Sequence, residues 1–446
     1  MSRVADTSLF SISWPIFIDV FLHFLTLLIN TYMVSHVSSS LVAAMVAGNH
    51  IFDLCITLFS FISVGCSVVI AQYLGARNTT IANKAIHISI GFNMLLGISL
   101  AILLFFGGNI LLKSMNTPEH LLEDGFNYLH ILGICLIPEA TSLILAAVLR
   151  VYGKVKTAMY VTLIVNMLTI IINTIVLYGL FGLPKYGLVG VAWSTVFGRV
   201  IGVILLSYLL MRGLKIKLKI PQLFKWERSI LSKILHIGLP AAGENLAWIG
   251  HFIVLISFIG LMGETALATQ AIYFQISLLM MLFGISISIG NEILVGHLVG
   301  AKRFEDAYNR GISSLKFAII VTVVVVFIFY FLSNILMNSF TDNVDIIKMA
   351  LPLFTLALIL EPIRSINIVM VNALRASGDA RFPLITAIIF MWGVCVPIAW
   401  FLGIKCEMGL LGVWIGFVCD ESLRGAANAY RWKSKKWQAK RLNVDI

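Results

Sequence analysis

Charged residues are scarce in this sequence, and their scarcity excludes a water-soluble protein. Only 12% of the 446 residues are Asp, Glu, Lys or Arg, whereas 59% are hydrophobic, and the mean hydropathy is +0.97. A soluble chain of this composition would expose large apolar patches to water. No polar stretch is long enough to fold as a separate domain. We therefore expect a membrane protein without a soluble domain.

Several motifs of enzyme and metal chemistry are also absent. The chain has no GxxxxGK[ST] phosphate loop, which argues against ATP as an energy source. It has no DDxxD motif, which a membrane-embedded prenyltransferase would need to hold magnesium and diphosphate. Its six cysteines show no CxxC spacing, so neither a disulfide framework nor a zinc site is indicated. We expect no enzyme activity and no cofactor.

Long apolar runs dominate what is present. A helix needs roughly 20 apolar residues to cross the hydrocarbon core of a bilayer. Twelve runs of this kind lie at residues 11–34, 44–72, 85–112, 127–149, 157–181, 188–211, 237–261, 268–298, 312–337, 348–373, 383–404 and 409–430. The sequence thus predicts an all-α polytopic membrane protein with about twelve transmembrane helices.

The distribution of basic residues predicts the orientation of these spans. Of the 32 Lys and Arg residues, 25 fall in the N-terminus, the even-numbered loops and the C-terminal tail, and four fall in the odd-numbered loops. The positive-inside rule places the first group in the cytoplasm. We expect a bacterial inner-membrane protein with both termini cytoplasmic. The net charge of +11 does not indicate nucleic-acid binding, because the basic residues lie in short loops between spans.

The two halves of the chain repeat each other at an offset of 225 residues. Asp19 corresponds to Glu244, and each lies four residues after a proline, Pro15 or Pro240. The same offset relates Gly65 to Gly290, Leu149-Arg150 to Leu374-Arg375 and Arg199 to Arg424. Six spans are an even number, so both copies enter the membrane from the same side. The repeat predicts two six-helix bundles related by a pseudo-two-fold axis along the membrane normal, an architecture found in transporters that work by alternating access.

Four segments follow from this organisation. We expect an N-terminal six-helix bundle at residues 1–212 and a C-terminal six-helix bundle at residues 237–430. Residues 213–236 form a basic, amphipathic cytoplasmic linker, and residues 431–446 form a basic cytoplasmic tail. Such segments are attracted to anionic lipid, so membrane lipid is an expected partner.

Several ordered strings resemble the multidrug and toxic compound extrusion (MATE) family of bacterial transporters. They are VGCSVVIAQYLGARNTTIANKA after the second span, AVLRVYGKVKTAMYVTLIVNMLTIIIN through the fourth and fifth spans, GLVGVAWSTVFGR at the sixth, and EPIRSINIVMVNALRASGDARFPL at the tenth and eleventh. The resemblance covers nearly the whole chain. It implies a secondary antiporter that exports organic cations or amphipathic compounds in exchange for protons or sodium.

The sequence departs from the family pattern at two first-half positions. Where many bacterial relatives have aspartates in the first and fifth spans, this chain has Asn30 and Asn173. An amide can ligate sodium, but it cannot carry a proton at physiological pH. The resemblance therefore leaves the choice between protons and sodium open.

Ionisable residues inside spans are the candidates for cation coupling, because a charge in lipid usually lines a cavity or pairs with another charge. The coupling candidates are Asp19, Glu244, Asp53, Glu361 and Glu139. Asp19 and Glu244 suit either coupling or a structural ion pair. Asp53 has no acidic mate in the repeat, because residue 278 is Leu278.

Two further patterns concern pairing inside the membrane. Glu361 and Arg364 are three residues apart on one helix, so they share a face and can pair. Glu139 is the repeat mate of Arg364, and this pair of opposite charges either bridges the two bundles or lines the cleft. The candidate ligands for a cation or substrate are Asn30, Thr31, Asn166, Asn173 and Arg364. A sodium site, if present, would involve Asn30, Asn173 and Asp53.

Two transport functions are compatible with this pattern. A multidrug antiporter would bind small cationic or amphipathic substrates, whereas a flippase for a lipid-linked carrier would need a strongly cationic cavity for phosphate. Inside the spans the acids outnumber the arginines by eight to three, which favours cations. We expect a monomer powered by a proton or sodium gradient.

Overall fold

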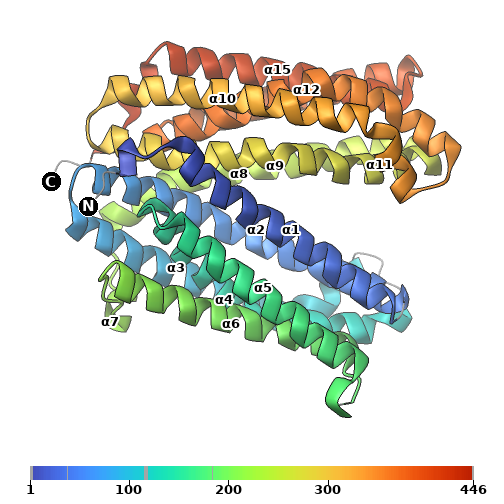
Figure 1. Cartoon of the computed structure of the whole chain (residues 1–446), viewed down its shortest axis with the longest axis horizontal. Helices are drawn as coiled ribbons and strands as arrows, with labels where there is room; N and C mark the ends of the chain where they lie inside the picture. The colour runs from blue at the N-terminus through green and yellow to red at the C-terminus, as the bar shows by residue number, and fades with distance from the viewer. Residues whose placement is uncertain (1–3, 38, 115–118, 183, 444–446) are drawn as a thin grey trace. The chain divides into compact units, whose positions relative to one another are not determined.

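The computed structural model describes residues 4–37, 39–114, 119–182 and 184–443 (Figure 1). Within these ranges the chain forms helices and turns and no β-strand. The long helices of the first half are α1 (Leu9–Ser35), α2 (Ser39–Gly75), α3 (Thr79–Ser114), α4 (Glu119–Val151), α5 (Val155–Tyr178) and α6 (Gly187–Gly213). Those of the second half are α8 (Arg228–Leu261), α9 (Glu264–Gly300), α10 (Phe304–Phe331), α12 (Val344–Ser377), α13 to η4 (Arg381–Lys405) and α15 (Gly409–Lys433).

These helices confirm the predicted all-helical membrane fold. Eleven segments of the described chain are long and apolar enough to cross a membrane. The predicted twelfth span, 409–430, is helix α15, which is long enough but carries Asp420, Glu421 and Arg424 in its middle. Helix α15 therefore differs from the eleven apolar segments in its charged residues and not in its length.

Some predicted boundaries were wrong. The span expected at 312–337 is interrupted after Phe331, and a short helix, α11 (Ser333–Phe340), follows. The linker expected at 213–236 contains the helical turn α7 (Ile220–Leu223), and its residues from Arg228 onwards form the beginning of α8. The linker also packs within the protein, because α7 contacts α3 and Lys84 of α3 forms a 2.5 Å ion pair with Glu227.

The segment Arg381–Lys405 crosses as one continuous helix with two π-helical turns. These turns, η3 (Met391–Cys395) and η4 (Phe401–Lys405), flank the five-residue α14 (Val396–Trp400), which contains Pro397. Proline has no backbone N–H and removes one helical hydrogen bond, and a π turn is a common local adjustment to such a defect.

The chain divides into two compact units. Unit 1 comprises residues 1–17, 74–77 and 239–446, and unit 2 comprises residues 18–73 and 78–238. The division differs slightly from the two halves of the sequence, because the beginning of α1 belongs to unit 1 and the beginning of α8 belongs to unit 2.

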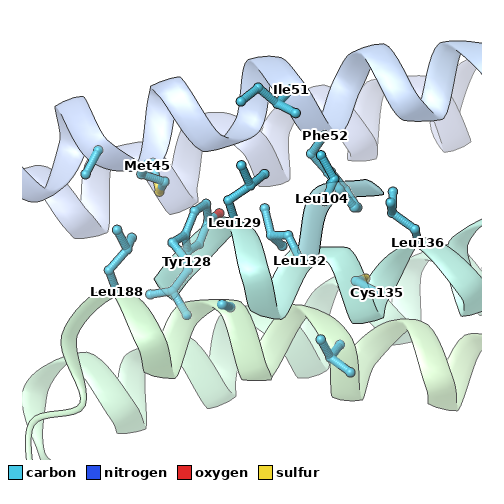
Figure 2. Packing of buried hydrophobic residues seen from close by; sticks show 14 of the residues in the cluster. Met45, Ile51, Phe52, Leu104, Tyr128, Leu129, Leu132, Cys135, Leu136 and Leu188 are labelled. Atoms are coloured by element: carbon cyan, nitrogen blue, oxygen red, sulfur yellow. The ribbon is translucent and has the colours of Figure 1, made fainter. Parts of the chain in front are cut away.

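The core of unit 2 is built around α4. This helix packs against α3 and α6, and leucines at 129, 132 and 136 of α4 are fully or almost fully buried (Figure 2). Tyr128 is the polar member of this core, and its hydroxyl donates a 2.9 Å hydrogen bond to Asn49 of α2. The buried hydroxyl thus keeps a partner in an apolar setting.

The core of unit 1 is built around α12, which packs extensively against both α9 and α15. Tyr273 of α9 packs edge to face on Trp414 of α15 with ring centroids 4.7 Å apart. The Tyr273 hydroxyl donates to the carbonyl of Leu353 on α12 at 2.8 Å, and Trp414 donates to Gln270 at 2.8 Å. One aromatic cluster therefore joins three helices.

The C-terminal tail is folded onto unit 1. Trp432 and Trp437 are fully buried and stack with their ring centroids 4.3 Å apart. Gly311 of α10 leaves room for this stack, since a Cβ at that position would lie 2.7 Å from the Trp432 ring. Arg431 forms a 2.7 Å ion pair with Asp379 after α12. The tail is therefore a packed element over much of its described length.

We predict that Gly412→Ala lowers the thermal stability of the protein. A Cβ at Gly412 of α15 would lie 2.6 Å from backbone atoms of Leu402 and Gly403, and backbone yields less easily than a flexible side chain. Overpacking of this kind costs about 1–3 kcal/mol. The measurement is the melting temperature in detergent. The control is Gly107→Ala, because a Cβ there meets no atom within 4 Å, and equal melting of both variants would contradict the prediction.

Candidate functional site

Asp19 and Glu244, the two acids at matching positions of the repeat, each form an ion pair. Asp19 of α1 pairs with Arg150 at the end of α4, within unit 2. Glu244 of α8 pairs with Arg375 near the end of α12 at 2.7 Å, within unit 1. Arg150 and Arg375 are themselves repeat mates, so both halves contain the same pair at the same place. Each acid therefore has a cationic neighbour from its own half.

The position related to Glu139 breaks this symmetry. Glu139 of α4 pairs with Arg199 of α6 at 2.8 Å inside unit 2. The repeat mates of these two residues are Arg364 and Arg424, so the second half has two arginines where the first has an acid and an arginine. Of the two alternatives for Glu139 and Arg364, the structure does not show the bridge, because each pairs with another residue of its own unit.

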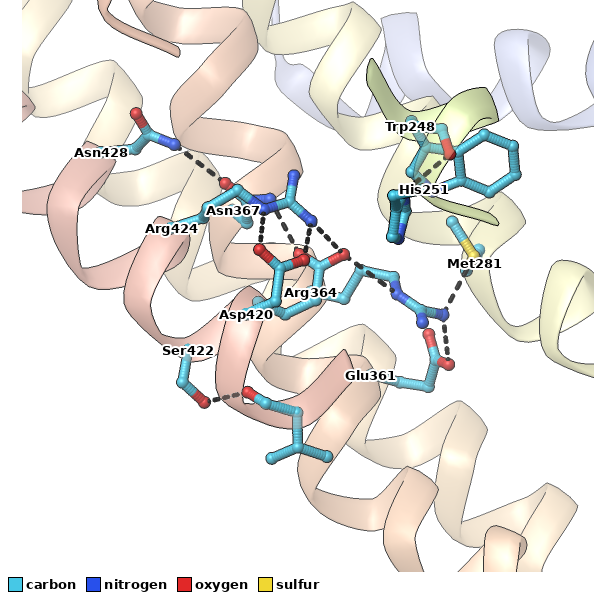
Figure 3. A network of polar contacts seen from close by, with 12 residues as sticks. Trp248, His251, Met281, Glu361, Arg364, Asn367, Asp420, Ser422, Arg424 and Asn428 are labelled. Carbon is cyan, nitrogen blue, oxygen red and sulfur yellow. Dashed lines mark hydrogen bonds and ion pairs between the residues drawn. The ribbon is translucent and has the colours of Figure 1, made fainter. Parts of the chain in front are cut away.

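In the second half, three carboxylates on two helices offset the charges of these two arginines. Glu361 lies one turn before Arg364 on α12, and Asp420 and Glu421 lie one turn before Arg424 on α15 (Figure 3). Spacings of three and four residues place these side chains on one face of each helix. All five are at most 7% exposed. We call these five residues the α12–α15 charge network.

Arg424 holds the α15 side of the network. Its Nε and Nη2 atoms donate to the two carboxylate oxygens of Asp420 at 2.8 and 2.6 Å, which is a two-point contact. Nη2 also lies 2.9 Å from Oε1 of Glu421. Two-point arginine–carboxylate contacts are the geometrically specific and strong form of a charge-assisted hydrogen bond.

Arg364 connects the two helices. Its Nη1 atom donates to Oε1 of Glu361 at 2.7 Å, which confirms the pairing predicted from their spacing. Its Nε atom lies 3.6 Å from Oε1 of Glu421, so Glu421 is shared between the two arginines. Ser277 of α9 donates a 3.0 Å hydrogen bond to Glu361 and thereby brings a third helix into the network.

Neutral polar groups surround the charges. Asn367 of α12 donates to Oε2 of Glu421 at 2.8 Å, and Asn428 of α15 donates to the side-chain oxygen of Asn367 at 2.9 Å. His251 of α8 lies beside the network in Figure 3, with Nδ1 2.6 Å from the carbonyl of Trp248. Its Nε2 atom is buried and has no hydrogen-bond partner in the described chain.

The network carries one more negative than positive charge when all five residues are ionised. Glu361, Asp420 and Glu421 contribute three carboxylates, and Arg364 and Arg424 contribute two guanidinium groups. Burial of an uncompensated charge costs several kcal/mol. A bound proton or monovalent cation would bring the network to neutrality, whereas the Glu139–Arg199 pair of the first half is neutral as it stands.

The predicted amide positions of the first half meet in unit 2. Asn173 of α5 donates a 2.9 Å hydrogen bond to Asn30 of α1, and Ser194 of α6 donates to the Asn173 side-chain oxygen. Asn166 lies two turns before Asn173 on the same face of α5, and its buried Nδ2 atom has no hydrogen-bond partner among the described residues. Asn30 and Asn173 therefore use amide groups to join α1, α5 and α6.

Two other predicted residues do not join this cluster. The Thr31 hydroxyl donates to the carbonyl of Leu27 on its own helix at 2.9 Å. Asp53 of α2 is exposed, and the described part of the chain shows no hydrogen bond or ion pair from its carboxylate. The contacts that link Asn30 to Asn173 thus do not extend to Asp53.

The network members Asp420, Glu421 and Arg424, and several residues that contact the network or lie beside it, were not predicted as site residues from the sequence. Asn428 lies four residues after Arg424, so helical spacing alone would have placed it on the same face. Ser277 and His251 come from α9 and α8, far from the network in sequence, and no spacing connects them to it.

A groove with a volume of about 970 Å³ lies elsewhere on unit 1. Residues of α10, α11, α12 and α15 line it, and Lys348 is its charged member. None of the residues predicted to couple or bind cations contributes to its lining.

Comparison with known proteins identifies the family. The family model described as MatE matches residues 15–175 and again residues 240–401. The chain belongs to the MATE family of transporters. The two matches begin 225 residues apart, which is the offset of the repeat, and the resemblance drawn from the motifs is confirmed.

Curated and solved relatives agree with this assignment. The chain is 38% identical to the uncharacterised transporter YisQ of Bacillus subtilis, over 96% of this chain and 94% of that protein. It is 25% identical to the probable multidrug resistance protein NorM of Thermotoga maritima, over 92% and 88%. A MOP superfamily transporter from Pyrococcus furiosus has the same fold, with a TM-score of 0.88, 21% identity and coverage of 97% and 98%. A MATE structure in the straight conformation gives a TM-score of 0.89 at 21% identity, with the same coverage.

We predict that the α12–α15 charge network tolerates loss of an acid better than loss of an arginine. Arg424→Met leaves Asp420 without its two-point partner, and a broken buried ion pair costs about 3–5 kcal/mol. Glu421→Gln removes the excess negative charge. The melting temperature should therefore fall in Arg424→Met and stay near that of wild type in Glu421→Gln.

A double substitution provides the control. Arg424→Met combined with Asp420→Asn removes both partners, so part of the lost stability should return. Equal melting temperatures for wild type and Arg424→Met would show that the network is not buried as the structure describes.

Proposed function

We propose that this MATE transporter is a secondary antiporter that exports organic cations or amphipathic drugs in exchange for protons or sodium. The observation that carries the proposal is the single excess negative charge of the buried α12–α15 charge network. The network attracts one positive charge, and a coupling ion supplies one. Relatives described as multidrug resistance proteins support the substrate class.

The coupling ion in this proposal binds in the second half rather than the first. The first-half positions at which many relatives have aspartates are the hydrogen-bonded Asn30 and Asn173, and neither amide takes up a proton. The nearby Glu139–Arg199 pair is already neutral. Glu361, shared by Ser277 and Arg364, and Glu421, shared by two arginines, are the acids through which α9, α12 and α15 would respond to the ion.

Exchange by alternating access follows from the two-fold repeat. In this scheme the loaded network favours one arrangement of the helices and the unloaded network favours the other, because only the loaded form is neutral. No ATP and no cofactor are required, since the ion gradient supplies the free energy. Each chain contains a complete network, so we propose that a monomer is sufficient.

The proposed setting is the bacterial inner membrane. The excess of basic residues in the even-numbered loops and at both ends supports cytoplasmic termini. A lipid-linked carrier would need a cationic cavity for its phosphates, and the net charge of the α12–α15 charge network has the opposite sign. We therefore do not propose a flippase.

The experiment is dye transport in liposomes. The full chain is reconstituted, and the movement of a fluorescent organic cation is followed under a proton gradient and, separately, under a sodium gradient. Wild type should respond to one gradient, and Glu361→Gln and Glu421→Gln should lose that response while still binding the dye. Asn173→Ala is the comparison from the first half and should keep gradient-driven movement.

The opposite outcome is also informative. Coupling that survives both glutamate substitutions but disappears in Asn173→Ala would move the coupling site to the first half. Absence of dye movement in wild type under both gradients would contradict the antiporter itself.

A further inference from the structure

A second buried acid of unit 1 lies outside the α12–α15 charge network. Glu292 of α9 is only 8% exposed, and the described residues offer its side chain no hydrogen bond or ion pair. It lies one helical turn after Ser288, so both side chains point from the same face of α9. That face packs against α12, because Asn372 of α12 donates a 2.8 Å hydrogen bond to the Ser288 hydroxyl.

The surroundings of Glu292 contain one cation that already has a partner. Arg375 donates to Asn372 at 3.2 Å and forms the 2.7 Å ion pair with Glu244. Arg375 is also the charged group that acts electrostatically on Glu292. Beyond the end of α9, Asp6 of η1 (Val4–Asp6) pairs with Arg303 at 2.8 Å.

Glu292 therefore gives this region an excess negative charge. Glu244 is paired with Arg375, whereas no cation of the described residues lies within ion-pair distance of Glu292. The first half offers a comparison, because the mate of Glu292 is Ser67 and the Asp19–Arg150 pair is balanced. The extra acid is thus a feature of the second half alone, and the architecture common to both halves does not require it.

Unpartnered polar atoms accompany the extra acid. Asn291 is fully buried, and neither its amide nitrogen nor its amide oxygen has a hydrogen-bond partner in the described chain. The Nε atom of Arg375 is likewise buried without a hydrogen-bond partner among the described residues. Buried polar atoms in folded proteins are nearly always hydrogen-bonded, so these exceptions need an explanation, and a bound ion or water in this part of unit 1 is one.

We propose that Glu292 is a proton-binding site of the second half, separate from the α12–α15 charge network. The step is simple: a proton adds to one carboxylate oxygen and gives a neutral carboxyl group, and the same O–H bond breaks on release. In the neutral form Glu292 leaves Arg375 to Glu244 alone. In the ionised form it competes with Glu244 for Arg375 and so acts on the contact between α8 and α12.

The position of Glu292 along α9 indicates the side of the membrane with which it exchanges protons. This step rests on the proposed antiport function. Glu292 lies eight residues before Gly300, the last residue of α9, which is about 12 Å along a helix. The distribution of basic residues places that end in the cytoplasm. Glu292 is therefore suited to exchange protons with the cytoplasmic side.

Infrared spectroscopy of the purified full-length protein tests this proposal without any transport. A protonated carboxyl group has a C=O band that disappears on ionisation. In a pH titration, wild type should show a band component that is lost in Glu292→Gln. The matched control is Glu305→Gln, because Glu305 is an exposed acid paired with Lys435 at 2.6 Å, and the component should remain in this variant.

The outcomes are decisive in either direction. Identical titrations of wild type and Glu292→Gln would overturn the proposal. A Glu292 band that responds to sodium at constant pH, and not to pH in the absence of sodium, would overturn it in favour of a metal-cation site. If Glu292→Gln fails to fold, Glu292→Asp serves instead, and the band should shift in position or midpoint.

The test also separates this proposal from the proposed function. The titration reports the protonation of Glu292 even if the protein moves no dye. Its result can therefore be interpreted even if the proposed antiport function is wrong. If antiport is confirmed, Glu292→Gln should lose proton-driven export and keep equilibrium dye binding. Export unchanged in Glu292→Gln would overturn the role in coupling.

Discussion

The structure depends on the cost of burying charge away from water. A carboxylate or guanidinium in a low-dielectric interior is tolerated only with a partner, and removal of that partner costs more than the pair contributes. Five acids inside the helices, at 19, 139, 244, 361 and 420, each have an arginine from their own unit. Three of these ion pairs join different helices, α1 to α4, α4 to α6 and α8 to α12, so they constrain which faces of those helices meet.

Where the pairing is incomplete, the same cost has a functional consequence. The α12–α15 charge network and the Glu292 region each have one acid more than the arginines beside them neutralise. Both belong to unit 1. A stable fold alone would not select an uncompensated buried acid, whereas an exchanger needs a charge that is neutralised in one state only.

The fold was predictable because its signals are long and repeated. Runs of about 20 apolar residues and a constant offset of 225 residues predicted the helices, and the two matches of the family model begin at the same offset. The break between α10 and α11 was missed because only Ser333 and Asn334 interrupt an apolar stretch that continues with Ile335, Leu336 and Met337. The early start of α8 was missed because its first turns are basic and read as linker.

The site was only partly predictable, for a different reason. Glu361 and Arg364 are close in sequence, so their spacing predicted the contact that the structure shows. The repeat related Glu139 to Arg364, and nothing in the sequence pointed to its actual partner, Arg199, 60 residues later on another helix. Contacts such as Ser277 with Glu361 join helices far apart in the chain, and no local pattern encodes them.

The repeat also orders these features in time. A duplicated gene begins with two identical halves, so a pair present in both halves, such as Asp19–Arg150 and Glu244–Arg375, dates from the single ancestral bundle. The opposite charges of Glu139 and Arg364 must have arisen after the duplication, as must the difference between Ser67 and Glu292. The ancestral bundle thus already had this one ion pair, and the differences in charge at the other positions record the later divergence of the two halves.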